Sequence, residues 1–105
     1  YNGTTAYIVT STITVNDGNW HHIVVTFEPS TATRIYIDGA LDNSNTTTTP
    51  ATIDNDANDV EIGKFGSNHS FDFDGNIANV QIYNKALSAG DALQNYNAQK
   101  DRFGL

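Results

Sequence analysis

The chain has 105 residues, a formal net charge of −7 and no cysteine. A chain of this length forms one domain, and without cysteine it has no disulfides, thiolate zinc sites or cysteine nucleophile. Its five basic residues are scattered, whereas a nucleic-acid partner requires a clustered basic surface to neutralise phosphates. We therefore expect no nucleic-acid partner. We also expect no membrane span, since no apolar run reaches roughly 20 residues.

Asparagine, threonine, aspartate and glycine dominate the first four fifths of the chain, together with β-branched residues. This composition favours strands joined by turns. Residues 6–15 predict one strand, with or without a bulge, and Asp17-Gly18 predicts the tight turn that ends it. Residues 19–27 predict the next strand.

The strongest hairpin signal is Asp38-Gly39, whose aspartate ends the sequence TRIYID and whose glycine precedes ALDN. Residues 43–58 predict a loop, in which residues 51–53 could form a short strand. Two further strands are predicted at residues 60–65 and 71–84. In the second of these, Phe71 and Phe73 alternate with Asp72 and Asp74, as in a half-buried strand.

The last fifth of the chain predicts a single short amphipathic helix. Ser88 is followed three residues later by Asp91, the pattern of a capping box at a helix start. Leu87 precedes the cap as a hydrophobic staple, and Leu93 and Tyr96 follow at helical spacing.

The segment GNWHHIVVTF contains the chain's only tryptophan and two adjacent histidines. Side chains alternate along a strand, so His21 and His22 should point to opposite faces. One metal ion cannot then be held by both, because its ligands converge at about 2 Å. We expect both histidines to be structural, and Trp20 to close the end of the core with its ring nitrogen bonded to a carbonyl.

Four motifs in order, NWHHIVVTF, RIYIDG, VEIGKF and FDGNIANVQIYNKALSAGD, resemble the second half of a laminin-G-like domain of the concanavalin A-like lectin/glucanase superfamily. The resemblance implies an all-β fold, an antiparallel jelly-roll β-sandwich with one short C-terminal helix. It also implies that residues 1–105 are a single domain lacking its N-terminal strands. Members of this superfamily bind carbohydrates, mediate adhesion or, in some branches, hydrolyse glycans.

Catalysis is not expected. Hydrolysis of a glycosidic bond needs two carboxylates roughly 5 to 10 Å apart, and the Glu-x-Asp-x-Glu triplet of the glucanase branch is absent. Glu28 and Glu61 stand apart in the sequence, while Asp72 and Asp74 adjoin a turn. We therefore expect the domain to act by binding and not as an enzyme.

A calcium site is one interpretation of the sequence DNDAND, whose carboxylates Asp54, Asp56 and Asp59 offer the oxygen ligands that calcium prefers. The resemblance implies calcium at a loop rim, to which Asp72 or Asp74 could contribute. The alternative is a solvated acidic loop that keeps the protein soluble.

For a glycan ligand, the candidate residues are Asn68 and His69, at the tip of the loop FGSNHSF. The Asn/Thr-rich loop after Asp42 is a second candidate. The neighbouring Phe65 and Phe71 are expected in the core, because each lies in or beside a predicted strand.

We hypothesise a non-catalytic binding or adhesion module with a glycan or protein ligand, located outside the cell or on a virion surface. The ending NYNAQKDRFGL resembles the C-termini of laminin-G-like domains in bacteriophage and marine viral structural proteins. This resemblance implies a decoration module in a homo-oligomer or larger assembly. The alternative is a calcium-dependent carbohydrate-binding module of a secreted or cell-surface protein.

Overall fold

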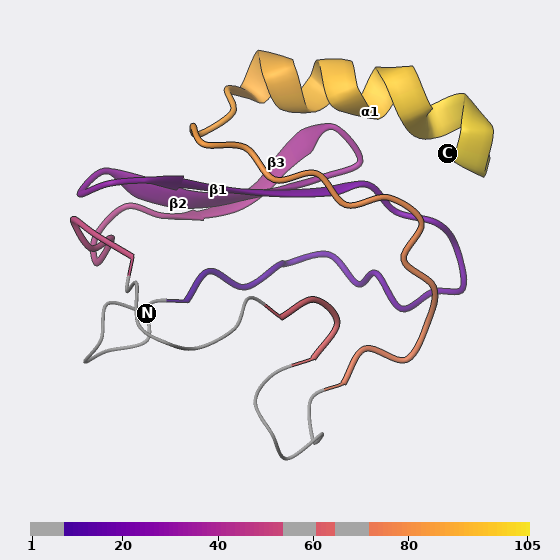
Figure 1. Ribbon diagram of the computed structural model, residues 1–105, viewed down its shortest axis with the longest axis horizontal. Helices are drawn as coiled ribbons and strands as arrows, with labels where there is room; N and C mark the ends of the chain where they lie inside the picture. The colour runs from indigo at the N-terminus through magenta and orange to yellow at the C-terminus, as the bar shows by residue number, and fades with distance from the viewer. Residues whose placement is uncertain (1–7, 54–60, 65–71) are drawn as a thin grey trace.

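The computed structural model describes residues 8–53, 61–64 and 72–105. The strands and helix of these residues are, in chain order, β1 (Ile23–Glu28), β2 (Ala32–Ile37), β3 (Ala40–Asn45) and α1 (Ala89–Phe103). The strands form an antiparallel sheet in the order β1-β2-β3. In Figure 1, α1 lies on one side of this sheet and the extended chain before β1 lies on the other.

The predicted Asp38-Gly39 hairpin is confirmed and joins β2 to β3. Asp38 has φ 51° and Gly39 has φ 83°, the positive angles that a two-residue turn requires at both central positions. The register pairs Ile37 with Ala40 and contains an irregularity between Ile35 and Tyr36.

The strands β1 and β2 form a second hairpin, with Val25 opposite Ile35. Thr31 N donates to Glu28 O at 3.0 Å and closes the turn, in which Ser30 has φ 56°. The Arg34 guanidinium donates to Glu28 across the two strands at 2.9 Å.

The predicted helix and its cap are also confirmed. Asp91 N donates to Ser88 Oγ, and Ser88 N donates to the Asp91 carboxylate, each at 3.1 Å. These two bonds satisfy amides that have no partner within the helix. The helix ends at Gly104, which has φ 70° and donates its N–H to Lys100 O.

A small core joins α1 to the sheet. Among the described residues, the buried side chains are Thr26, Ala32, Tyr36, Ile37, Leu87 and Ala92. Leu87 is thus buried next to the cap, as expected of a staple. The helix packs on the β2–β3 turn so closely that a Cβ atom on Gly39 would lie 2.7 Å from the Tyr96 ring and 3.0 Å from Leu93.

Three expected strands are not observed. The described parts of segments 6–15, 60–65 and 71–84 have no strand pairing, and one backbone bond, from Phe73 N to Gly63 O, joins the last two. The short strand at residues 51–53 is likewise absent. The described residues therefore form one three-stranded sheet and not the two sheets of a jelly roll. Alternating residues favour a strand, but the ladder forms only beside a partner strand.

Candidate functional site

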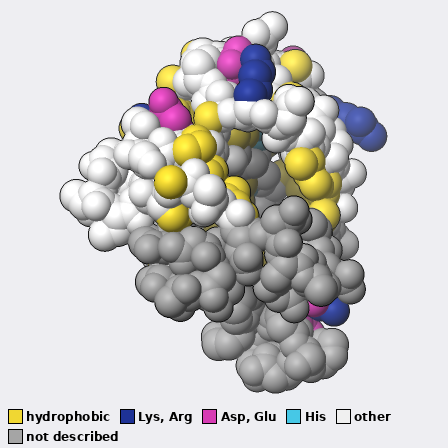
Figure 2. All heavy atoms as spheres, turned by 60° about the vertical axis from the view of Figure 1, so that its left-hand side comes forward, with side chains coloured by type: hydrophobic (Ala, Val, Ile, Leu, Met, Phe, Trp, Pro, Cys, Tyr) yellow, Lys and Arg dark blue, Asp and Glu magenta, His cyan; other side chains and the backbone are white. Residues whose placement is uncertain are grey.

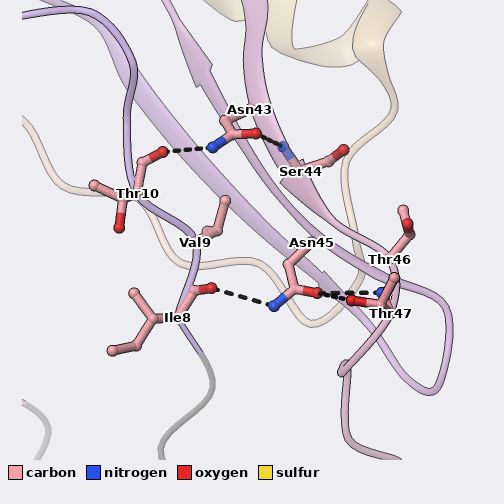
Figure 3. A pocket seen from close by; sticks show the side chains of 8 residues that line it. All are labelled: Ile8, Val9, Thr10, Asn43, Ser44, Asn45, Thr46 and Thr47. Atoms are coloured by element: carbon pink, nitrogen blue, oxygen red, sulfur yellow. Dashed lines mark hydrogen bonds between the residues drawn. The ribbon is translucent and has the colours of Figure 1, made fainter.

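A polar pocket of about 410 Å³ lies between β3 and the extended chain near residue 9 (Figure 3). Amide and hydroxyl side chains dominate its wall. The residues that line it are Ile8, Val9, Thr10, Asn43, Ser44, Asn45, Thr46 and Thr47. The pocket therefore includes residues of the Asn/Thr-rich segment that the sequence offered as a second glycan-binding candidate, although residues 43–45 belong to β3 and not to the expected loop.

The two amides of this pocket are engaged in holding the N-terminal segment. Asn43 Nδ2 donates to Thr10 O at 2.7 Å, and Asn45 Nδ2 donates to Ile8 O at 3.2 Å, as Figure 3 shows. Asn45 Oδ1 accepts the backbone N–H groups of Thr47 and Thr48. Both amides are structural. Their N–H groups bond to backbone carbonyls of residues 8–10, where a paired β-strand would have used backbone N–H groups.

The hydroxyls of the pocket are the groups that remain for a ligand. Thr10, Ser44 and Thr46 are exposed, and their side chains make no hydrogen bond to another described residue. Hydroxyls donate and accept hydrogen bonds. This wall therefore suits a neutral, hydroxyl-rich ligand better than a charged one.

The residues predicted from the other loops lie outside the described part of the chain. They are Asn68 and His69 for a ligand and Asp54, Asp56 and Asp59 for calcium. Among the residues that the structure describes, no group of three or more His, Cys, Asp or Glu side chains is placed to hold a metal ion.

A second polar cluster surrounds His21, just before β1. The His21 Nδ1 atom lies 2.8 Å from Asp38 Oδ2, and Nε2 lies 3.0 Å from Asp17 Oδ1. From the sequence, Asp17 and Asp38 were expected only to form turns. Because the two carboxylates are far apart in sequence, no local signal paired them with this histidine.

His22 has a different environment, so the two histidines do not converge on one site, as expected. Its ring lies 6.0 Å from the Tyr96 ring, and burial lowers the pKa of His22 below 6.5 although the Asp38 charge opposes this effect. Trp20 differs from expectation: it is exposed and packs on Phe103 with ring centroids 5.2 Å apart.

An apolar groove of about 1260 Å³ runs between β1, the extended chain of residues 76–87 and α1. Its walls include side chains that are largely exposed: Val25 is 61% exposed and Ile82 is 79% exposed. Figure 2 shows hydrophobic side chains on both sides of a hollow on the face it presents. The strands that were expected to fold as a sandwich thus leave much of their apolar surface open.

Residues 1–92 match the laminin-G family described as the concanavalin A-like lectin/glucanases superfamily. The chain therefore belongs to this family, which confirms the resemblance carried by the four motifs. Laminin-G-like domains are commonly non-catalytic binding modules of extracellular proteins.

Two similar proteins give this assignment context. A crystal structure of an S-layer domain-containing protein (residues 221–444) from Clostridium thermocellum superposes with a TM-score of 0.66 and is 25% identical. The match covers 84% of this chain and 44% of that structure. The rat sushi, von Willebrand factor type A, EGF and pentraxin domain-containing protein 1 is 44% identical over 52 residues, which are 44% of this chain and 2% of the rat protein.

The described part of the chain contains no helix that is long and apolar enough to cross a membrane. The one helix, α1, has 15 residues and carries charged side chains.

Proposed function

We propose that this domain is a non-catalytic binding module displayed outside the cell, and that it holds a neutral glycan in the pocket between β3 and residues 8–10. The observation that carries this proposal is the set of exposed hydroxyls of Thr10, Ser44 and Thr46 in that pocket. Their hydrogen-bonding capacity is not used by the fold. A concave surface lined by hydroxyls can form hydrogen bonds with the hydroxyls of a sugar.

Charge favours a neutral glycan over a sulfated or phosphorylated one. The chain has a net charge of −7, so long-range repulsion slows the approach of an anionic ligand. No Lys or Arg lines the polar pocket, and an anion held there would have no positive partner.

Family and relatives support a location outside the cell. The family supplies binding modules of extracellular proteins, and one relative is an S-layer domain-containing protein. The non-catalytic part of the proposal rests on the sequence, which lacks the Glu-x-Asp-x-Glu triplet of the glucanase branch. Turnover in a glycan hydrolysis assay that disappears in Asp72→Asn would overturn the non-catalytic part of the proposal.

The test is an array of neutral and anionic glycans, probed with the 105-residue chain and with a variant carrying Thr10→Ala, Ser44→Ala and Thr46→Ala. We expect binding to neutral glycans that the triple variant loses without a change in melting temperature. Thr14→Ala is the matched control, because Thr14 is exposed and lies outside the pocket. Equal binding by the triple variant, or binding to anionic glycans alone, would contradict the proposal.

The S-layer relative also favours a second function, that of a structural module in a surface assembly. The virion decoration module inferred from the C-terminal sequence is one form of it. Native mass separates this function from that of a tethered binding module: an assembly module forms a stable oligomer, whereas a tethered module can remain monomeric.

The calcium-dependent alternative makes its own prediction. If Asp54, Asp56 and Asp59 hold calcium, added calcium raises the melting temperature because it binds only the folded state, and a chelator reverses the effect. Asp56→Asn should abolish the rise. A melting temperature that is the same with calcium and with chelator would exclude this alternative.

A further inference from the structure

The imidazole of His21 joins two turns that are well separated in sequence. Its Nδ1 atom contacts Asp38, in the β2–β3 turn, and its Nε2 atom contacts Asp17, in the turn before β1. The His21 side chain is only 14% exposed. A single, partly buried ring therefore lies between two carboxylates.

These two contacts require a particular protonation state. An ionised carboxylate only accepts hydrogen bonds, and a neutral imidazole carries one N–H donor and one acceptor nitrogen. The ring can donate to Asp17 and Asp38 at the same time only as an imidazolium. When the proton leaves, one nitrogen presents a lone pair to a carboxylate, and that contact becomes repulsive.

The surrounding bonds decide which contact is lost. Asp38 Oδ1 accepts His22 N at 2.9 Å, and Asp38 N donates to His22 O at 2.8 Å, so Asp38 is fixed to the chain beside the ring. The Asp17 side chain is more exposed than that of Asp38, 42% against 33%, and its other bond stays within its own turn, to Asn19 N. Neutral His21 should keep its proton on Nδ1, facing Asp38, and lose Asp17.

We propose that Asp17, His21 and Asp38 form a proton-operated latch. Protonated His21 holds the turn of residues 17–19 against the β2–β3 hairpin, and loss of the proton releases that turn while the hairpin stays intact.

The electrostatics agree with this geometry. The hydrogen bonds from Asp38 and then Asp17 raise the pKa of His21 above 6.5, and the bond to His21 lowers the pKa of Asp17 from 3.8 to about 2. The charged groups at this end of α1 are Lys100, over the Tyr96 ring, Arg102, over the Phe103 ring, and Asp101 between them in sequence. None of the three is bonded to His21, whose pKa is governed by Asp38 and Asp17.

The sign of the pH dependence follows from these directions. The latch is fully closed between pH 3.8 and pH 6.5, and its contribution to stability is lost as the pH rises through the folded-state pKa of His21. On the acid side, the Asp17 contribution is present above pH 3.8 and is lost as the pH falls toward about 2. The latch is therefore closed in mildly acidic solution and opens toward alkaline pH.

The test follows the imidazole and the turn together by NMR in the whole chain between pH 4.5 and 9 (~0.5-unit steps suffice for a one-proton transition). We expect His21 to titrate above 6.5, and the Asn19 amide to shift with the same midpoint and lose protection several-fold as the proton leaves. The nitrogen shifts of neutral His21 should report the Nδ1–H form. The fluorescence of Trp20, the only tryptophan and a neighbour of His21, should change with that midpoint.

Two variants make the result decisive. Asp17→Asn removes the negative charge at Nε2, so the midpoint of His21 should fall and the Asn19 amide should stop following it. His22→Gln is the control, because His22 titrates below 6.5, and the transition of the turn should remain. A His21 midpoint at or below 6.5, or an Asn19 amide that is indifferent to it, overturns the proposal even if a variant fails to fold.

Discussion

Gly39 combines two requirements that a single residue rarely meets. Its φ of +83° is unfavourable for any side chain, and the Tyr96 ring occupies the space where a Cβ atom would lie. Gly18 has nearly the same φ, +84°, but has no atom within 4 Å of that position. Substituting Gly18 therefore tests backbone strain alone, whereas substituting Gly39 tests backbone strain together with a steric clash.

We expect Gly18→Ala to lower the free energy of unfolding by about 1 kcal/mol, the cost of a side chain at positive φ. Gly39→Ala should cost about 2 to 4 kcal/mol, because displacing Tyr96 adds the penalty of overpacking. Urea denaturation of both variants measures the difference. Equal losses would mean that α1 does not rest on the turn as described.

Asn45 is the residue on which the polar pocket most depends. Asn45→Asp keeps the acceptors for Thr47 and Thr48 but removes the donors to Ile8 O and Thr48 Oγ1. We expect a loss of about 1 to 2 kcal/mol, because Ile8 O is left unpaired whereas the Thr48 hydroxyl can itself donate to the new carboxylate.

Hydrogen exchange of the Thr12 amide, which donates to Asp42 in the same segment, measures this effect, since it should lose protection before the sheet does. Asn97→Asp is the control: it adds the same charge on the exposed side of α1, where Asn97 makes no hydrogen bond to a described residue. Equal exchange in the two variants would show that Asn45 does not hold the segment.

At the scale of the element, α1 depends on its N-terminal cap. Ser88→Ala removes the bond from Asp91 N and should cost about 1 kcal/mol, whereas Ser88→Asp retains an acceptor there and should cost less. Thermal unfolding followed by circular dichroism distinguishes them. Identical melting temperatures for the two variants would contradict the cap.

The cap also makes the stability of the helix depend on pH in acid. Hydrogen bonds from the Ser88 backbone and side chain lower the pKa of Asp91 below 3.8. The contribution of Asp91 to stability is therefore present above pH 3.8 and is lost as the pH falls through its folded-state pKa. In Asp91→Asn, the acid unfolding curve should be flatter in this window than in the wild type.

The elements that were predicted correctly carry their own local signals. Asp38-Gly39 encodes its turn through backbone angles, and Ser88 with Asp91 encodes a helix start, so neither needs a distant partner. The segments 8–15 and 72–84 have strand-like composition but form no ladder, because pairing depends on a neighbour that composition does not specify.

The same distinction applies to the candidate site. The Asn/Thr-rich segment was predicted as a glycan site from its side-chain chemistry, which a sequence displays directly, and this role stays a prediction. The hydrogen bonds of Asn43 to Thr10 and of His21 to Asp38 could not be predicted from the sequence, because each joins residues far apart in the chain.

At the scale of the whole molecule, the apolar groove exposes hydrophobic side chains of β1 and of residues 76–87. Contiguous apolar patches are uncommon on monomers. We expect the isolated chain to bind a fluorescent apolar dye, and Val25→Thr with Ile82→Thr to reduce that binding with little loss of stability. Both side chains are mostly exposed already.

Ile13→Thr is the matched control for the dye experiment. Ile13 is also exposed, but it lies outside the groove. Dye binding that falls equally in the control and in the double variant would show that the dye does not report on the groove.

The attachment of the N-terminal segment has a consequence for alignment. A ladder of backbone hydrogen bonds is indifferent to sequence and can slip by two residues with its faces preserved. Here Asp42 holds Thr12, Asn43 holds Thr10 and Asn45 holds Ile8. Because side chains make these bonds, a slip would break all three together, so this segment has one alignment where a paired strand would have had several.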